Sequence, residues 1–266
     1  MGRERRWAII KKSSLKRETT TVGEAFQKTK DLMRKAGYPI EDNVRVVVNP
    51  NLGFMGYTFP KAGRFTIVVS GAAVESGLLG GLIVHEMGHV YRMQTNHPSH
   101  SGRAISYAMD LFDGRALKMD YQQKILHDAV NHVEDLYADD ISFKVFQKNN
   151  LFPPEVAGQF FQGWMTPSTV VSGDARKDRW VNASLMLRNS LALSNMARHG
   201  IPDSGDQAKS ANGRFLSGLP PGMAKMFQYF YKVMMGLTED VTEKEFEGVL
   251  GDYLEKFVEL AEGERQ

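Results

Sequence analysis

The chain contains no cysteine among its 266 residues. Disulfide scaffolds, thiolate zinc sites, cysteine nucleophiles and iron–sulfur clusters are therefore excluded, and any metal ion must be held by His, Asp or Glu. Long apolar runs are also missing, because no stretch reaches the roughly 18 consecutive apolar residues that span a bilayer. We therefore expect a soluble protein without a transmembrane segment. The N-terminus lacks the apolar core of a signal peptide, so a cytoplasmic location is expected.

Charge of one sign is not in excess, since 33 Lys and Arg residues face 31 Asp and Glu residues, giving a net charge of +2. The whole chain thus gives no strong nucleic-acid signal. The charges are nevertheless uneven along the sequence. Residues 1–17 carry seven bases and one acid, whereas residues 239–266 carry ten acids and three bases. The sequence does not indicate an oligomeric state. The expected partner, a peptide or protein substrate, follows from the motifs below and not from the charge.

The order of strand-like and helix-like segments predicts an α+β fold. A small antiparallel N-terminal sheet is expected from Val44–Val48, Phe54–Phe59 and Phe65–Ser70, which are rich in β-branched and aromatic residues. After Ser70 the pattern is helical, with candidate helices at Leu78–Met93, Tyr121–Gln147, Glu155–Gly163, Arg179–His199, Gly222–Met235 and Thr242–Ala261.

We expect two domains, a core over residues 1–150 and a helical C-terminal subdomain over residues 151–266 that packs on it. Residues 202–221 are rich in Gly, Ser and Pro, and this composition predicts a mobile loop. Capping boxes of the Thr-x-x-Glu type predict helix starts at Thr21 and Thr242.

Six of the seven histidines lie between positions 85 and 132, and the most specific motif there is His85-Glu86-Met87-Gly88-His89. On a helix, His85 and His89 are one turn apart on the same face, so both imidazoles can bind one zinc ion. The neighbouring Glu86 can take a proton from water that the ion activates. The surrounding apolar residues indicate that the motif lies on a helix.

A zinc site of this kind needs a third protein ligand and an open position for water. Thr95 and Arg92 occupy the positions where a metzincin has its third histidine and its glycine, which disfavours that subclass. His97 and His100 follow the predicted helix end and could fold back as ligands or contact substrate. The alternative source is a later helix.

The predicted helix Tyr121–Gln147 carries Asp128, His132, Asp135 and Asp139 along one face. Titratable groups in line on a half-buried face are costly unless a cation compensates them. We therefore expect Asp135 to be the third ligand, and Asp139, one turn later, to hydrogen-bond a ligating histidine. A solvated acidic face is the competing interpretation.

The HEMGH helix, the preceding strand Phe65–Ser70 and the later Asp135-x-x-x-Asp139 element resemble the gluzincin zinc metallopeptidases, and in particular the Ste24-like membrane metallopeptidases. The resemblance covers residues 44–147. It implies that Asp139 matches the Asp of the family's Glu-x-x-x-Asp element and that Asp135 stands where the ligand Glu is expected. Because aspartate is one methylene shorter, either the two helices approach more closely or Glu134 is the ligand. The membrane spans of the Ste24-like group are missing.

The resemblance implies a zincin-like fold and a site that hydrolyses peptide bonds, with substrate bound as an extended strand along the sheet edge beside the zinc helix. We expect Phe65–Ser70 to provide that edge. His132, His97, Tyr91 and Arg92 are candidates for contacts with the developing oxyanion, and the sequence does not rank them.

Together these observations predict a zinc-dependent metallopeptidase. The expected metal ligands are His85, His89 and Asp135, the general base is Glu86, Asp139 supports a ligand, and Glu134, His132 and His97 are further candidates. One alternative is a non-catalytic or regulatory interaction protein with the same fold. Another is a nucleic-acid-associated protease that uses His97 or His100 as third ligand and its basic N-terminus to bind phosphate.

Overall fold

The computed structural model describes residues 22–112, 117, 119–151 and 153–263. Thr21 and the basic residues 1–17 lie outside the described residues. The chain divides into two compact units, one made of Met1–Thr95 and Ile141–Asn150 and the other of Asn96–Asp140 and Leu151–Gln266. These units interleave along the sequence, so their boundaries differ from the expected single boundary after residue 150. The two expected domains stay a prediction.

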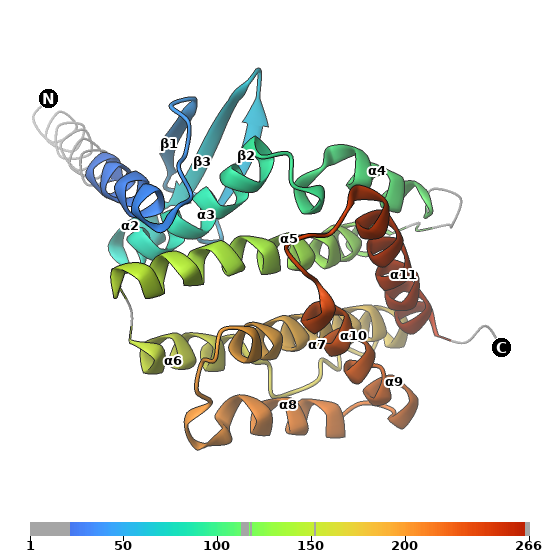
Figure 1. Ribbon diagram of the computed structural model, residues 1–266. Helices are drawn as coiled ribbons and strands as arrows, with labels where there is room; N and C mark the ends of the chain where they lie inside the picture. The colour runs from blue at the N-terminus through green and yellow to red at the C-terminus, as the bar shows by residue number, and fades with distance from the viewer. Residues whose placement is uncertain (1–21, 113–116, 118, 152, 264–266) are drawn as a thin grey trace, which may run out of the picture. The chain divides into compact units, whose positions relative to one another are not determined.

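The first unit contains a three-stranded sheet of β1 (Val44–Asn49), β2 (Gly56–Lys61) and β3 (Arg64–Ser70), which Figure 1 shows. β2 and β3 form an antiparallel hairpin whose turn residues, Ala62 and Gly63, both have positive φ, as a tight hairpin turn requires. The strand order is β1-β3-β2, and β1 runs parallel to β3.

The α+β prediction is confirmed, but the prediction of an antiparallel sheet is wrong for β1. Five of the seven residues of β3 are buried, more than in β1 or β2, as expected of the central strand. The chain therefore passes from β1 to the far edge before it returns through β3.

Helices cover one face of this sheet. Residues 22–36 form a helix, followed after the sheet by α2 (Gly71–Glu75) and α3 (Leu79–Gln94). Their apolar residues form one core with β3 and with the end of α5 (Asp120–Asn149). This core includes Phe26, Met33, Ile67, Val69, Ile83, Met87, Ile141 and Val145.

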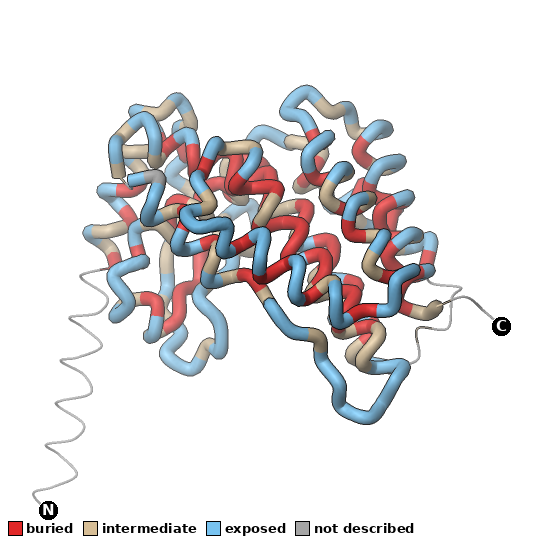
Figure 2. The backbone as a smooth tube through the Cα atoms, turned by 90° about the horizontal axis from the view of Figure 1, so that it is seen from below, coloured by how far each residue is buried: buried red, intermediate tan, exposed pale blue. Residues whose placement is uncertain are grey.

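The second unit is helical. In addition to the first part of α5, it contains α4 (Gly102–Asp110), α6 (Pro154–Trp164), α7 (Ala175–Arg198), α8 (Gln207–Ser217), α9 (Pro221–Lys225), α10 (Phe227–Gly236) and α11 (Glu243–Glu262), with short 3-10 turns at Pro98–His100 and Ser204–Asp206. Large side chains such as Trp180, Phe215, Phe230 and Phe257 fill its core. Figure 2 shows the buried positions following the helices, while many exposed ones lie in loops.

Two helix predictions need correction. Residues 202–221 are not a loop, because α8 forms within them around the buried stripe Ala208, Ala211 and Phe215, whose helical spacing is hidden among Gly and Ser residues. The expected helix Gly222–Met235 is split into α9 and α10 at Met226. The predicted capping box at Thr242 and Glu245 is confirmed. None of the helices in the described ranges is long and apolar enough to cross a membrane.

Candidate metal site

Helix α3 presents the two histidines of the HEMGH motif side by side. The Nε2 atoms of His85 and His89 are 3.2 Å apart, and both rings are half-buried. Two ligands bound tetrahedrally at 2.0–2.1 Å from one zinc ion have their donor atoms about 3.3 Å apart. The spacing of the two ring nitrogens therefore matches that of ligands that share one ion.

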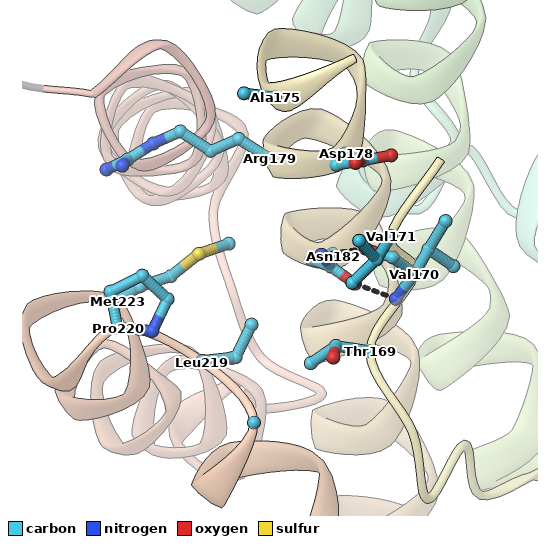
Figure 3. Close-up of a pocket in the computed structure, with 11 residues that line it drawn as sticks. Thr169, Val170, Val171, Ala175, Asp178, Arg179, Asn182, Leu219, Pro220 and Met223 are labelled. Carbon is cyan, nitrogen blue, oxygen red and sulfur yellow. Dashed lines mark hydrogen bonds between the residues drawn. The ribbon is translucent and has the colours of Figure 1, made fainter. Parts of the chain in front are cut away.

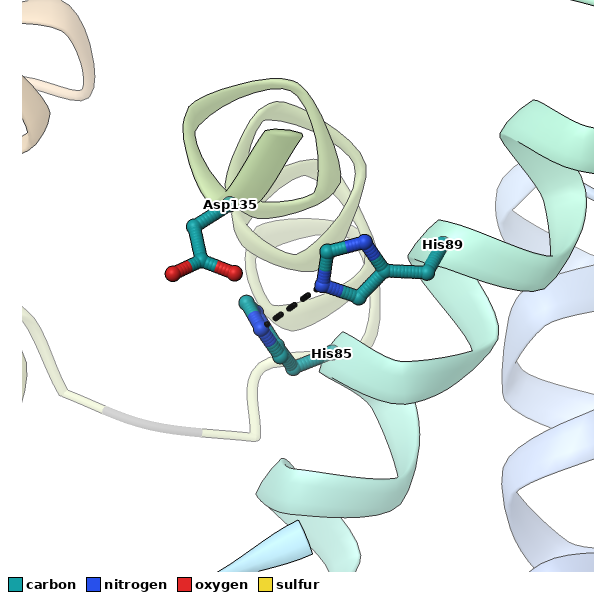
Figure 4. A group of neighbouring side chains, drawn as sticks. All are labelled: His85, His89 and Asp135. Carbon is teal, nitrogen blue, oxygen red and sulfur yellow. Dashed lines mark hydrogen bonds between the residues drawn. The ribbon is translucent and has the colours of Figure 1, made fainter. Parts of the chain in front are cut away.

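A carboxylate of α5 completes a group of three possible ligands. His85, His89 and Asp135 each offer one ligand atom, and these atoms all lie within 4.8 Å of one another. Figure 4 shows the Asp135 carboxylate turned toward the two imidazole rings. Helix α5 is continuous through Asp135 and reaches Ile141 less than two turns later, where it enters the same core as α3.

The chemistry of these donors fits a divalent metal ion. Two imidazole nitrogens and one carboxylate oxygen are a ligand set typical of zinc and of neighbouring transition metals. Three protein donors leave one position of a tetrahedral ion open. The group formed by His85, His89 and Asp135 could therefore hold a metal ion, and Glu134 is not part of it.

Glu86 is held against the sheet. The residue is 4% exposed, and its Oε2 accepts a hydrogen bond of 2.7 Å from the Thr58 hydroxyl on β2. Gly56 lies two residues before Thr58, and its lack of a side chain lets β2 come close to the β3 backbone. A Cβ atom there would lie 2.8 Å from the backbone oxygen of Val68 and 3.5 Å from Oε1 of Glu86. The strand thus runs directly beside the Glu86 carboxylate.

The sequence analysis did not identify Thr58 or Gly56. Alternation along a strand places them on the same face, which is a usable signal. Which strand lies beside Glu86 depends on the strand order. The expectation that Phe65–Ser70 is an edge strand is wrong, because β3 lies between β1 and β2. Among the described strands, β2 is the edge beside Glu86.

Residues at the end of α7 contact two neighbouring carboxylates of α5, those of Asp139 and Asp140. The Asn195 amide donates a hydrogen bond of 2.7 Å to the buried Asp139 carboxylate. Arg198 and His199 contact Asp140, and Arg198 also donates to the backbone oxygen of Leu237 at 2.8 Å. Burial raises the pKa of Asp140, but the bonds from His199 and Arg198 outweigh it and hold the pKa below its usual value. The support of a ligating histidine by Asp139 stays a prediction.

The remaining histidine candidates are not in the group of possible ligands. Burial lowers the pKa of His132, with nearby Asp135 opposing that shift, and its Nδ1 has no hydrogen-bond partner among the described residues. Both ring nitrogens of His97 are engaged, Nδ1 with the Ser99 hydroxyl at 2.8 Å and Nε2 with the Glu239 backbone oxygen at 3.1 Å. The Nδ1 atom of His100 also lies 2.8 Å from the Ser99 hydroxyl.

The second unit contains a pocket of about 240 Å³, which Figure 3 shows. Its wall includes Val170, Asn182 and Met223, and none of the predicted site residues lines it. The Asn182 side chain bonds both backbone polar atoms of Val170, at 2.7 and 2.9 Å. Its amide therefore fixes the segment around Val170, and we assign this pocket no function.

Comparison with known proteins gives one family match. The sequence model of a family described as a family of unknown function (DUF5781) matches residues 14–159. The matched stretch includes His85, His89 and Asp135. No curated protein and no solved structure matches the chain.

Proposed function

The chain belongs to this family of unknown function, DUF5781, and we propose that it is a metal-dependent hydrolase, specifically a zinc metallopeptidase. One observation carries the proposal: the Nε2 atoms of His85 and His89 are 3.2 Å apart, with an Asp135 oxygen close enough to complete a ligand group. Imidazole and carboxylate donors are those that catalytic zinc sites use.

The residues around this group supply the remaining parts of a hydrolytic site. A divalent ion held there supplies a Lewis acid that polarises a carbonyl and activates water. Glu86 follows His85 directly in the sequence and serves as the general base, taking a proton from the attacking water and passing it to the leaving amine. The Thr58 hydroxyl orients the Glu86 carboxylate for this transfer.

The β2 edge favours a peptide as the substrate. Among the described strands, β2 pairs only with β3, so its other edge has no strand partner. Pro60 lies within β2, and proline inside a strand is typical of sheet edges. An extended peptide that pairs with β2 would place its backbone beside Glu86. Main-chain pairing of this kind gives affinity with little dependence on side chains.

Metal content and activity test the proposal separately. The full chain, reconstituted with zinc and dialysed, should retain about one zinc ion per molecule, and His85→Ala and His89→Ala should lose it. A chelator should lower the melting temperature of the parent, since an ion at 100 times its dissociation constant adds about 2.7 kcal/mol of stability. It should leave the melting temperature of His89→Ala unchanged.

Activity is then measured on a panel of unstructured peptides. Glu86→Gln should abolish hydrolysis while the chain stays folded and its zinc content stays at the parental value, and Glu134→Gln is the matched control that should keep activity. A chain that binds no zinc after reconstitution, or a Glu86→Gln variant with parental activity, would contradict the proposal.

A further inference from the structure

One face of the sheet carries residues that the proposed hydrolytic site does not use. Ile67 and Val69 of β3 point into the core of the first unit, so their neighbours Thr66 and Val68 point to the opposite face. The strand register places Arg45 and Phe59 on either side of Thr66, and Val47 and Tyr57 on either side of Val68. These residues and Phe54, which precedes β2, are called the outer sheet face.

Aromatic rings are exposed along the β2 side of the outer sheet face. Phe54 is 59% exposed and Tyr57 39%. The ring centroids of Tyr57 and Phe59 are 5.8 Å apart at an interplanar angle of 24°, and the Phe54 ring lies 5.8 Å from that of Tyr57. Three adjacent rings of this kind form a surface on which flat groups can stack. An exposed apolar group of this size is typical of an interaction site.

The same face is basic. Residues 43–74 contain no Asp or Glu and carry three bases, Arg45, Lys61 and Arg64. Lys61 and Arg64 are direct cross-strand partners, a like-charge arrangement that destabilises a sheet. Within the described ranges, no carboxylate forms an ion pair with any of these three bases. An anionic ligand would compensate the repulsion.

Arg45 shows how these charges meet the aromatic surface. Its Nε donates a hydrogen bond of 3.0 Å to the hydroxyl of Thr66, and Thr66 is in turn the cross-strand partner of Phe59 on β2. The register thus places the basic residues and the rings on one face of the sheet. A ligand that binds there must be anionic and must also offer flat apolar faces.

We propose that the outer sheet face binds single-stranded nucleic acid. Bases stack on Phe54, Tyr57 and Phe59, while Arg45, Lys61 and Arg64 bind phosphates. An apolar peptide or a second copy of the chain would use the rings but not three uncompensated bases. The inference is independent of the metal site, since Thr58 and Gly56 meet Glu86 from the other face of β2.

Fluorescence anisotropy of a labelled oligothymidylate of about 15 nucleotides, titrated with the full chain, tests this inference. Tyr57→Ala should weaken binding about 5-fold to 150-fold, whereas Tyr57→Phe keeps the ring and should bind within about 2-fold of the parent. Removing one phosphate contact with Arg64→Ala should reduce the slope of log affinity against log salt by about 0.7.

Matched controls lie in the second unit. Tyr107→Ala removes a tyrosine that is 53% exposed and Arg214→Ala removes an exposed arginine, and both variants should bind as the parent does. All variants keep the basic residues 1–17, so binding by that segment is the same in each. Thermal melts followed by circular dichroism identify any variant that fails to fold. If Tyr57→Ala fails, Tyr57→Thr replaces it, and Tyr57→Phe shows that binding needs the ring and not the hydroxyl.

Three outcomes would overturn the inference. The first is that the parent does not bind the oligonucleotide at low salt. The second is that Tyr57→Ala and Arg64→Ala bind it as tightly as the parent, which assigns binding to another segment. The third is that Tyr57→Ala abolishes self-association or the binding of an uncharged labelled peptide while oligonucleotide binding persists. Loss of hydrolysis in Glu86→Gln has no bearing on this result.

Discussion

The hydrogen bond between Thr58 and Glu86 allows a quantitative test of the geometry. Thr58→Val keeps the shape of the side chain and removes the hydroxyl that donates to the carboxylate. The bond is 2.7 Å long, which is typical of a hydroxyl bound to an ionised carboxylate, and Glu86 is only 4% exposed, so little water can replace the lost donor.

A hydrogen bond to a charged group contributes about 1.5–3 kcal/mol, and valine recovers a few tenths through its strand preference. We therefore expect the free energy of unfolding to fall by about 2 kcal/mol. For a chain of this size this is a melting temperature about 4–8 °C lower.

The assay is urea unfolding of the metal-free chain at pH 7, followed by circular dichroism. Thr66→Val is the matched control, because its hydroxyl accepts from the exposed Arg45, whose guanidinium can turn to water. This control should cost less than about 1 kcal/mol. If Thr58→Val is as stable as the parent, or if the two variants lose the same amount, the contact between β2 and Glu86 is not as described.

Two further predictions concern stability. Gly56→Ala should lower the free energy of unfolding by about 1–3 kcal/mol, because the added methyl would lie 2.8 Å from the Val68 backbone oxygen; Gly248→Ala, with nothing within 4 Å, should instead raise it by about 0.5–1 kcal/mol in thermal melts. Asp140→Asn should cost about 3 kcal/mol at pH 7, because Arg198, whose side chain is 13% exposed, loses its carboxylate partner and keeps only the backbone oxygens of Met234 and Leu237. Because the pKa of Asp140 is lowered in the folded chain, its contribution is present above pH 3.8 and is lost as the pH falls through the folded value, so pH-dependent unfolding curves of the parent and Asp140→Asn should converge in acid. A constant difference down to pH 2 would show that Asp140 does not titrate this way.

The helical part of the site could be predicted because its geometry is local. His85 and His89 are four residues apart, so helix periodicity alone places both imidazoles on one face. Asp135 and Glu134 are adjacent and project about 100° apart on the helix. The choice between them depends on how α5 is rotated by packing at Ile141 and Val145, which no local pattern records.

Contacts between residues far apart in the chain could not be predicted from the sequence. Asn195 bonds Asp139 from a helix far along the chain, and nothing in the spacing of these two residues indicates the contact. The parallel pairing of β1 with β3 was missed for a similar reason, since pairing of neighbouring segments is the default expectation. The zincin-like fold, zinc and the peptidase activity stay predictions that the experiments above address.

The interleaving of the two units restricts how this chain can be cut. The chain leaves the first unit after Thr95 and returns to it at Ile141. A truncation at either end therefore cannot remove one unit whole and leave the other whole. Ending the chain at Asn150 would strip Leu126, Val133 and Leu136 of the helices that bury them. Limited proteolysis should consequently yield fragments that aggregate and no fragment that folds on its own. For the same reason, neither unit could be exchanged between related genes as one continuous segment.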